Sequence, residues 1–301
     1  MSVRGSAARS VAAPAVAPTA PAALRVCVVS EDMGPPLDEG IRKFAHALVG
    51  ALARRGPVLG VSARRAFRGH RVVGVRGDKL FVSPRLRAQV RAFAPHLLCY
   101  VPSASDTVFS LLRLRVLAWG WRRAATALVA LQPRPHTRVG WWAVRRLAPD
   151  LLFVGSRRRA EHFRRRGCPA RWLPSGVDTE RFRPVPPEVK RALRARHGLP
   201  QDAFLVLHVG HITPGRNVGL LAAVQRRWQV VMVAGNSVGE DAALRRCLEE
   251  AGVVVVDRYL EAVEELYQAA DCYLFPVRSE GGSIEAPLSV LEAMACDLPV
   301  V

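Results

Sequence analysis

The chain has 301 residues, half of them hydrophobic, which is long enough for two domains of ordinary size with sizeable cores. No apolar run reaches the roughly 18 residues that a membrane-spanning helix needs. The six cysteines are scattered without a C-x-x-C pair, which argues against a zinc site and a disulfide framework. The formal net charge is +19: residues 1–150 hold 24 basic and 7 acidic groups, whereas residues 151–301 hold 20 and 18. The basic half is either a solvated arginine-rich surface or a face that attracts anionic lipid, nucleic acid or phosphorylated substrates.

Residues 1–23 contain no acidic side chain and carry prolines at positions 14, 18 and 21, so the sequence predicts a disordered tail. The segment has no uninterrupted apolar core of roughly 7–15 residues, which argues against a cleaved signal peptide. Its composition leaves an organellar transit peptide open.

The first predicted elements form a β-α-β unit. Residues 24–30 are an apolar run typical of a buried strand, and apolar residues recur at helical spacing through residues 41–55 after a loop at 31–40. A further strand at 58–61 completes the unit, which implies a parallel sheet with crossover helices. The alternation continues with strands at 96–101, 127–132, 151–155 and 172–174 and helices at 106–117, 141–147 and 157–166.

The proline-rich segment 183–187 predicts a linker, which divides the chain into an N-terminal domain at 24–183 and a C-terminal domain at 184–301. Beyond the linker we predict strands at 204–210, 229–234, 253–256, 272–276 and 298–301 and helices at 218–224, 241–251, 262–270 and 288–295. The predicted fold is therefore α/β, with two doubly wound domains. Two such domains facing each other would form a cleft between the carboxyl ends of their strands, where doubly wound sheets bind ligands.

Four stretches carry a resemblance to a known family: residues 38–41 (DEGI), 173–184 (LPSGVDTERFRP), 209–217 (VGHITPGRN) and 287–295 (PLSVLEAMA). In order and spacing they resemble the retaining GT-B glycosyltransferases of the large family that includes sucrose synthases and bacterial mannosyl- and glucosyltransferases, called glycosyltransferase group 1. The resemblance implies a GT-B fold of two Rossmann-like domains, with the nucleotide sugar bound by the second. Because the chain stops at Val301 inside a predicted strand, we expect this second domain to be incomplete.

The resemblance places Arg216 at the family's lysine position, beside the donor diphosphate. Fixed cations aimed at a leaving diphosphate lower the barrier, and a guanidinium can hold phosphate with two hydrogen bonds. His211 stands at a family arginine position, where it would bind the diphosphate when protonated or would serve only as a structural histidine.

Glu292 matches the family glutamate that accepts hydrogen bonds from the ribose hydroxyls, a role that suits an acceptor with two oxygens. The family's partner carboxylate lies eight positions earlier, which here is Ile284. Either the loop shifts by one residue and presents Glu285 to the sugar, or that carboxylate is lost; Glu280 is a weaker substitute. The backbone N–H groups of Leu288 and Ser289 would begin the last helix and attract phosphate.

In the N-terminal half, Gly40 precedes a helix and lacks a side chain, so the backbone there can approach a ligand closely. His136 follows a predicted strand and is the candidate, by chain order, for the histidine that family members place near the sugar. A plain loop residue is the alternative interpretation for each, and Arg134 is an alternative that would serve the acceptor. Residues 109–123 mix Leu, Val and Trp with Arg, which is typical of an interfacial helix or of a core helix with basic ends.

The resemblance implies a metal-independent enzyme, a hexosyltransferase that moves a sugar from a nucleotide-diphosphate donor to a sugar or lipid-linked acceptor with retention of the anomeric configuration. It implies no cofactor besides the donor substrate and no metal site. The implied setting is cell-envelope polysaccharide synthesis, in the cytoplasm or peripherally on the inner face of the membrane. The basic half would contact an anionic membrane surface.

Three alternatives stay open. His211 and Ile284 depart from the family pattern, which favours a non-catalytic GT-B protein that binds nucleotide or a partner without turnover. The ending at Val301 favours a fragment of a longer reading frame. Nucleic-acid binding rests on charge alone, because the sequence has neither zinc-ligand spacing nor an aromatic RNA-recognition motif, so the sequence argues against it.

Overall fold

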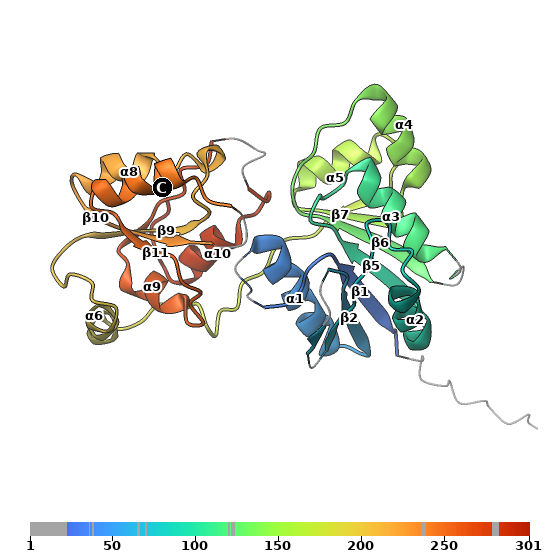
Figure 1. Cartoon of the computed structure of the whole chain (residues 1–301), viewed down its shortest axis with the longest axis horizontal. Coiled ribbons are helices and arrows are strands. Elements are labelled where there is room, and N and C mark those ends of the chain that lie inside the picture. The colour runs from blue at the N-terminus through green and yellow to red at the C-terminus, as the bar shows by residue number, and fades with distance from the viewer. Residues whose placement is uncertain are drawn as a thin grey trace, which may run out of the picture.

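The computed structural model describes residues 23–35, 37, 39–64, 67–69, 71–119, 121, 124–235, 239–278 and 283–301. Residues 1–22 of the predicted tail, Asp38 of the first motif and Glu280 lie outside the described residues. The described chain folds into two parallel-rich sheets, each flanked by helices, which stand side by side (Figure 1). This arrangement confirms the predicted α/β class.

The first sheet has eight strands in the order β3-β4-β2-β1-β5-β6-β7-β8, with every neighbouring pair parallel except β3 and β4. The strands are β1 Val26–Ser30, β2 Val58–Ser62, β3 Phe67–Arg68, β4 Val72–Gly74, β5 Leu97–Val101, β6 Ala125–Ala130, β7 Leu151–Val154 and β8 Ala170–Trp172. The helices of this half are α1 Gly40–Ala53, α2 Pro84–Phe93, α3 Val108–Ala118, α4 Arg138–Leu147 and α5 Arg157–Arg164.

The second sheet has four parallel strands in the order β11-β10-β9-β12. They are β9 Leu205–Gly210, β10 Gln229–Ala234, β11 Val254–Val256 and β12 Cys272–Tyr273. The helices are α6 Pro187–Arg196, the 3₁₀ turn η1 Pro214–Arg216, α7 Leu220–Gln225, α8 Ala242–Glu250, α9 Glu264–Ala269 and α10 Leu288–Ala295. Where a strand was predicted at 298–301, Val300 forms an isolated parallel bridge with Tyr273.

Helices cover both faces of each sheet, which is why the central strands are continuous apolar runs. Strand β1 is buried at all five positions. Its side chains alternate between two cores, with Cys27 and Val29 in one and Val26 and Val28 in the other.

Five of the described elements were not predicted from the sequence: β3, β4, α2, α6 and the short turn η1. Helix α2 is rich in arginine and buries only Leu86 and Val90, so its apolar periodicity is weak. Helix α6 begins within the segment predicted as a linker, because Pro187 occupies its first turn, where a missing N–H costs nothing. The segment between β8 and α6 connects the two sheets and contains the predicted domain division at residues 183 and 184.

Helix α3 packs against the first sheet as a core helix. Leu111, Leu114 and Leu117 are buried, and Arg113 turns inward to form an ion pair of 2.6 Å with Glu31. Of the two interpretations left open for residues 109–123, this packing supports a core helix with basic ends, which ends at Ala118.

Asp271 ties α6 to the second sheet. It accepts a backbone hydrogen bond of 2.7 Å from Leu205 and forms ion pairs of 2.6 Å with Lys190 and Arg194. Burial raises the pKa of Asp271, but these hydrogen bonds and the two cations outweigh burial and hold the pKa below its ordinary value.

We expect Asp271→Asn to lower the free energy of unfolding by about 1–3 kcal/mol at pH 7, because two cations lose their charged partner. A carboxyl with a lowered folded pKa stabilises the protein above its unfolded pKa of about 3.9 and loses that contribution as the pH falls through the folded value. The difference between wild type and variant in urea denaturation should therefore shrink below pH 4. Asp202→Asn, at an exposed carboxylate, is the control; an equal loss in both variants would contradict this role.

Candidate glycosyltransferase site

A cleft of about 350 Å³ lies between the carboxyl ends of the two sheets. On the side of the first sheet, the cleft is lined by the loop before α1, by the start of α1 and by the residue that follows β6 closely: Leu37, Glu39, Gly40, Ile41, Lys43 and Gln132. The second sheet contributes the ends of β9 and β10, the η1 turn, the loop before α9 and the start of α10. Its position matches the ligand site of doubly wound sheets, and its volume suits a small ligand.

Two helix N-termini open onto the cleft. Helix α1 begins at Gly40 and α10 begins at Leu288, and neither has a side chain capping its first turn. A Cβ on Gly40 would lie 3.8 Å from Ile284 Cδ1, so the start of α1 approaches the loop that leads into α10. Free N–H donors and the positive ends of both helix dipoles therefore face the same space.

Arg216 adds a full positive charge to this space. It ends the η1 turn after β9, and its guanidinium lies over Gly210, where a Cβ would come within 3.1 Å of Nη1. Burial lowers the pKa of Arg216, an effect that nearby Tyr273 and Glu39 oppose. The structure thus brings together Arg216, Gly40, Leu288 and Ser289 at the cleft, with His211 half-buried at its wall.

Glu292 also lines the cleft, but its carboxylate already has partners. Oε1 forms an ion pair with Lys43 of α1, and Oε2 accepts a hydrogen bond of 3.0 Å from the Tyr267 hydroxyl. The Lys43 ammonium also lies 5.3 Å from the centre of the Phe182 ring. Ribose hydroxyls would have to share this carboxylate with Lys43 or displace it.

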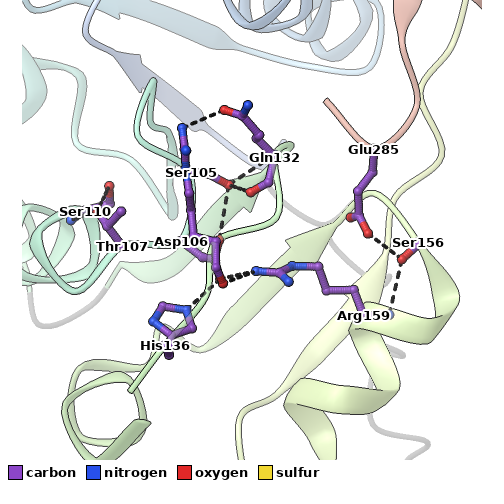
Figure 2. A network of polar contacts seen from close by, with 10 residues as sticks. Ser105, Asp106, Thr107, Ser110, Gln132, His136, Ser156, Arg159 and Glu285 are labelled. Atoms are coloured by element: carbon purple, nitrogen blue, oxygen red, sulfur yellow. Dashed lines mark hydrogen bonds and ion pairs between the residues drawn. The ribbon is translucent and has the colours of Figure 1, made fainter. Parts of the chain in front are cut away.

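The loop before α10 presents Ile284, not Glu285, to the cleft. The Glu285 side chain turns toward the first sheet, where its Oε1 accepts a hydrogen bond of 2.7 Å from Ser156 (Figure 2). Its backbone N–H donates to the Leu131 carbonyl at 2.9 Å, and a Cβ on Gly155 would lie 2.9 Å from Glu285 Cβ. Of the two alternatives left open by the sequence, this geometry supports loss of the sugar-facing carboxylate.

His136 lies outside the cleft, in a buried polar network. Its Nε2 is 2.9 Å from Asp106 Oδ2, which also receives Arg159 Nη2 at 2.6 Å (Figure 2). The side chain is 4% exposed and packs against the rings of Trp141 and Phe163. This placement does not support a direct sugar contact for His136.

Gln132 and Lys43 are among the cleft residues that the sequence analysis did not single out. Gln132 follows the end of β6, a position that could have identified it, since ligands bind at strand carboxyl ends. Arg134 does not line the cleft itself, but it donates a hydrogen bond of 2.7 Å to Gln132 Oε1 and so helps to orient that side chain. Lys43 sits one turn into α1, and nothing in the local sequence indicates that it reaches the second sheet.

Within the described residues, no group of three His, Cys, Asp or Glu side chains could hold a metal ion. Among the described helices, none combines the length and apolar character needed to cross a membrane.

Residues 204–301, which contain the second sheet, match the family model described as "Glycosyl transferases group 1". This segment is a glycosyltransferase group 1 domain. Over 145 residues the chain is 35% identical to D-inositol 3-phosphate glycosyltransferase 2 of Catenulispora acidiphila, across 42% of this chain and 32% of that protein. The matched stretch therefore spans about a third of that relative's length.

A second relative aligns along most of the chain. It is named GDP-mannose-dependent alpha-(1-6)-phosphatidylinositol monomannoside mannosyltransferase, from Mycolicibacterium smegmatis, and is 28% identical over 304 residues, across 89% of this chain and 77% of the relative.

Solved structures show the same fold at low identity. Sucrose-phosphate synthase from Thermosynechococcus elongatus superposes with a TM-score of 0.71 at 18% identity, across 92% of this chain and 80% of that one. WaaG, a glycosyltransferase involved in lipopolysaccharide biosynthesis, gives 0.59 at 15% identity, across 91% and 80%. The chain is thus similar to GT-B glycosyltransferases in fold, as the sequence predicted.

We expect the Lys43–Glu292 pair to stabilise the contact between the two sheets. Lys43→Met should lower the free energy of unfolding by about 1–3 kcal/mol, because it leaves a buried carboxylate without its cation. Adding Glu292→Gln should recover part of that loss, since the neutral amide needs no counter-charge. Urea denaturation of both single variants and the double variant measures the coupling. Additive losses would show that the two side chains do not interact.

Proposed function

We propose that the chain is a glycosyltransferase that takes a sugar from a nucleotide-diphosphate donor bound in the cleft. The observation that carries the proposal is the convergence of Arg216 with the N-termini of α1 and α10 at one cleft, at the edge of a glycosyltransferase group 1 domain. These groups together form a site for a dianionic or trianionic phosphate group.

In the proposed reaction, the bond between the sugar and the diphosphate breaks and negative charge grows on the leaving diphosphate. Arg216 and the N–H groups of Leu288 and Ser289 stabilise that charge in a partly buried site, where electrostatic interactions are stronger than in water. We propose that these protein groups stabilise the charge without a metal ion. The reaction retains the configuration at the anomeric carbon. His211, when protonated, adds a second cation.

The names of the relatives support a choice of donor and acceptor classes. The name of the Mycolicibacterium smegmatis relative specifies GDP-mannose and a phosphatidylinositol-linked mannoside. We therefore propose a hexose donor, with GDP-mannose as the first candidate, and a sugar or lipid-linked acceptor of the cell envelope. Ile284 in place of a carboxylate makes the sugar end of the cleft more apolar than in the family pattern.

We further propose that the protein works at the cytoplasmic face of a membrane. Trp119 after α3 and Trp142 in α4 are 76% and 62% exposed, and the exposed Arg138, Arg145 and Arg146 stand on α4. Exposed indoles beside arginines suit a surface that meets anionic headgroups.

A non-catalytic nucleotide-binding protein is the second candidate. It is favoured by Lys43, which forms an ion pair with Glu292, the carboxylate expected to bind ribose. It is also favoured by Ile284, which stands at the position of a family carboxylate. Release of nucleoside diphosphate from a nucleotide sugar separates the two, because only the enzyme turns over.

Arg216→Ala should lower the rate of nucleoside diphosphate release from GDP-mannose or UDP-glucose by roughly 10²–10³-fold, the usual effect of removing one donor that stabilises a developing anion. Arg246→Ala, an exposed arginine on α8, is the matched control and should keep wild-type rates. Equal rates for wild type and Arg216→Ala would remove Arg216 from the proposed site.

Vesicle sedimentation tests the membrane proposal. The protein should bind phosphatidylglycerol vesicles and not phosphatidylcholine vesicles, and added salt should weaken binding because it screens exposed charges. The double variant Trp119→Ala/Trp142→Ala should bind less, whereas Trp228→Ala, a partly exposed tryptophan of the second half, should not. Equal vesicle binding by wild type, the double variant and Trp228→Ala would rule out α3 and α4 as the membrane contact.

A further inference from the structure

We propose that His208 is a positioning residue that holds the Arg216 guanidinium toward the donor diphosphate by accepting a hydrogen bond from it at Nε2. This inference rests on the proposed function, because it concerns how Arg216 is presented to that diphosphate. His208 was not among the residues that the sequence singled out.

The placement of His208 is decided by β9. Residues 208 and 210 point to the same face of the strand, because side chains alternate along it. A Cβ built on Gly210 would lie 3.0 Å from His208 Nε2 and 3.1 Å from Arg216 Nη1. The two nitrogens therefore flank one small space, which stays open because residue 210 is glycine.

The proton on the imidazole is located by its other nitrogen. Nδ1 lies 2.8 Å from the Leu274 carbonyl oxygen, which can only accept, so Nδ1 carries the proton. In the neutral ring Nε2 then has a lone pair. Burial, together with nearby Arg216, lowers the pKa of His208 to about 4, although the hydrogen bond to Leu274 acts in the opposite direction. The ring is therefore neutral at physiological pH, and Nε2 is an acceptor.

His208 Nε2 is a buried hydrogen-bond acceptor that needs a donor. His208 is fully buried, and Nε2 has no hydrogen-bond partner among the described residues. Such an atom costs free energy unless it is paired. The ring also stacks on Tyr273, with centroids 6.2 Å apart, so it is held in one orientation. The nearby guanidinium carries five N–H donors, one of which pairs with Nε2 in the proposed contact.

A phenylalanine at position 208 would fill the same core volume, so packing alone does not call for a histidine. The Nε2 acceptor of His208 has a role only if it holds the Arg216 guanidinium in place. A guanidinium that donates one N–H backward to Nε2 keeps its remaining donors directed into the cleft, where they can reach two phosphate oxygens.

The first test needs no ligand. In protein labelled with ¹⁵N-histidine, the His208 ring is identified by the resonances that disappear in His208→Phe. We expect the Nδ1–H tautomer, and an Nε2 resonance that moves in Arg216→Ala and stays in place in Arg246→Ala. An Nε2 resonance that is unchanged by Arg216→Ala would overturn the inference, whatever the protein's function.

The second test compares His208→Asn and His208→Gln. The asparagine amide can replace the Nδ1 donor to Leu274 but not the Nε2 acceptor, whereas the glutamine oxygen reaches toward the Nε2 position. By calorimetry with UDP and GDP, we expect His208→Asn to weaken binding of the diphosphate that wild type prefers by several-fold, with binding of the parent nucleoside unchanged. His208→Gln should restore most of the affinity, and thermal melts should show both variants folded.

A double-mutant comparison separates positioning from packing. In the Arg216→Ala background, His208→Asn should have no further effect on diphosphate affinity, because its effect passes through Arg216. Additive losses, or equal losses in Asn and Gln, would overturn the inference. If wild type binds neither UDP nor GDP, the proposed function fails, and the resonance test still decides the role of His208.

Discussion

The convergence of Arg216 with two helix N-termini at the junction of the two sheets is the constraint around which the other features of the site are arranged. Parallel strands with crossover helices place the N-terminus of the next helix at the carboxyl edge of the sheet. When two such sheets face each other, helix starts from both converge, as α1 and α10 do here. Arg216 stands at the same edge, because its turn directly follows β9. An anionic ligand is the natural occupant of such a place.

The two halves are also joined at this junction by charged and polar contacts. Lys43 of α1 pairs with Glu292 of α10, and Glu285 docks on Ser156 at the start of α5. Both contacts use carboxylates that the sequence had assigned to substrate. Glu292 can exchange Lys43 for a ribose hydroxyl while its carboxylate stays in the cleft. The contact with Ser156 instead directs the Glu285 carboxylate away from the cleft. Ile284, Gly40 and Gln132 therefore line the cleft where the Glu285 carboxylate does not.

Much of the fold could be predicted from the sequence, because periodicity is a local property. Helix α10 begins and ends at the predicted residues, and the strands that were predicted begin within a few residues of their predicted starts, whereas the short β3 and β4 were missed. Helix α6 was missed because adjacent prolines indicate a linker unless it is known that one of them starts a helix. The site was less predictable, because it depends on contacts between distant segments. Whether Ile284 or Glu285 faces the cleft is decided by Leu131 and Ser156, more than 100 residues away in the chain.

The most direct test of the account is a crystal structure of the chain with whichever of UDP and GDP binds it more tightly. The account predicts the diphosphate within hydrogen-bonding distance of the Arg216 guanidinium and of the N–H groups of Leu288 and Ser289, with the ribose next to Glu292. A diphosphate bound away from Arg216 and the start of α10 would contradict it.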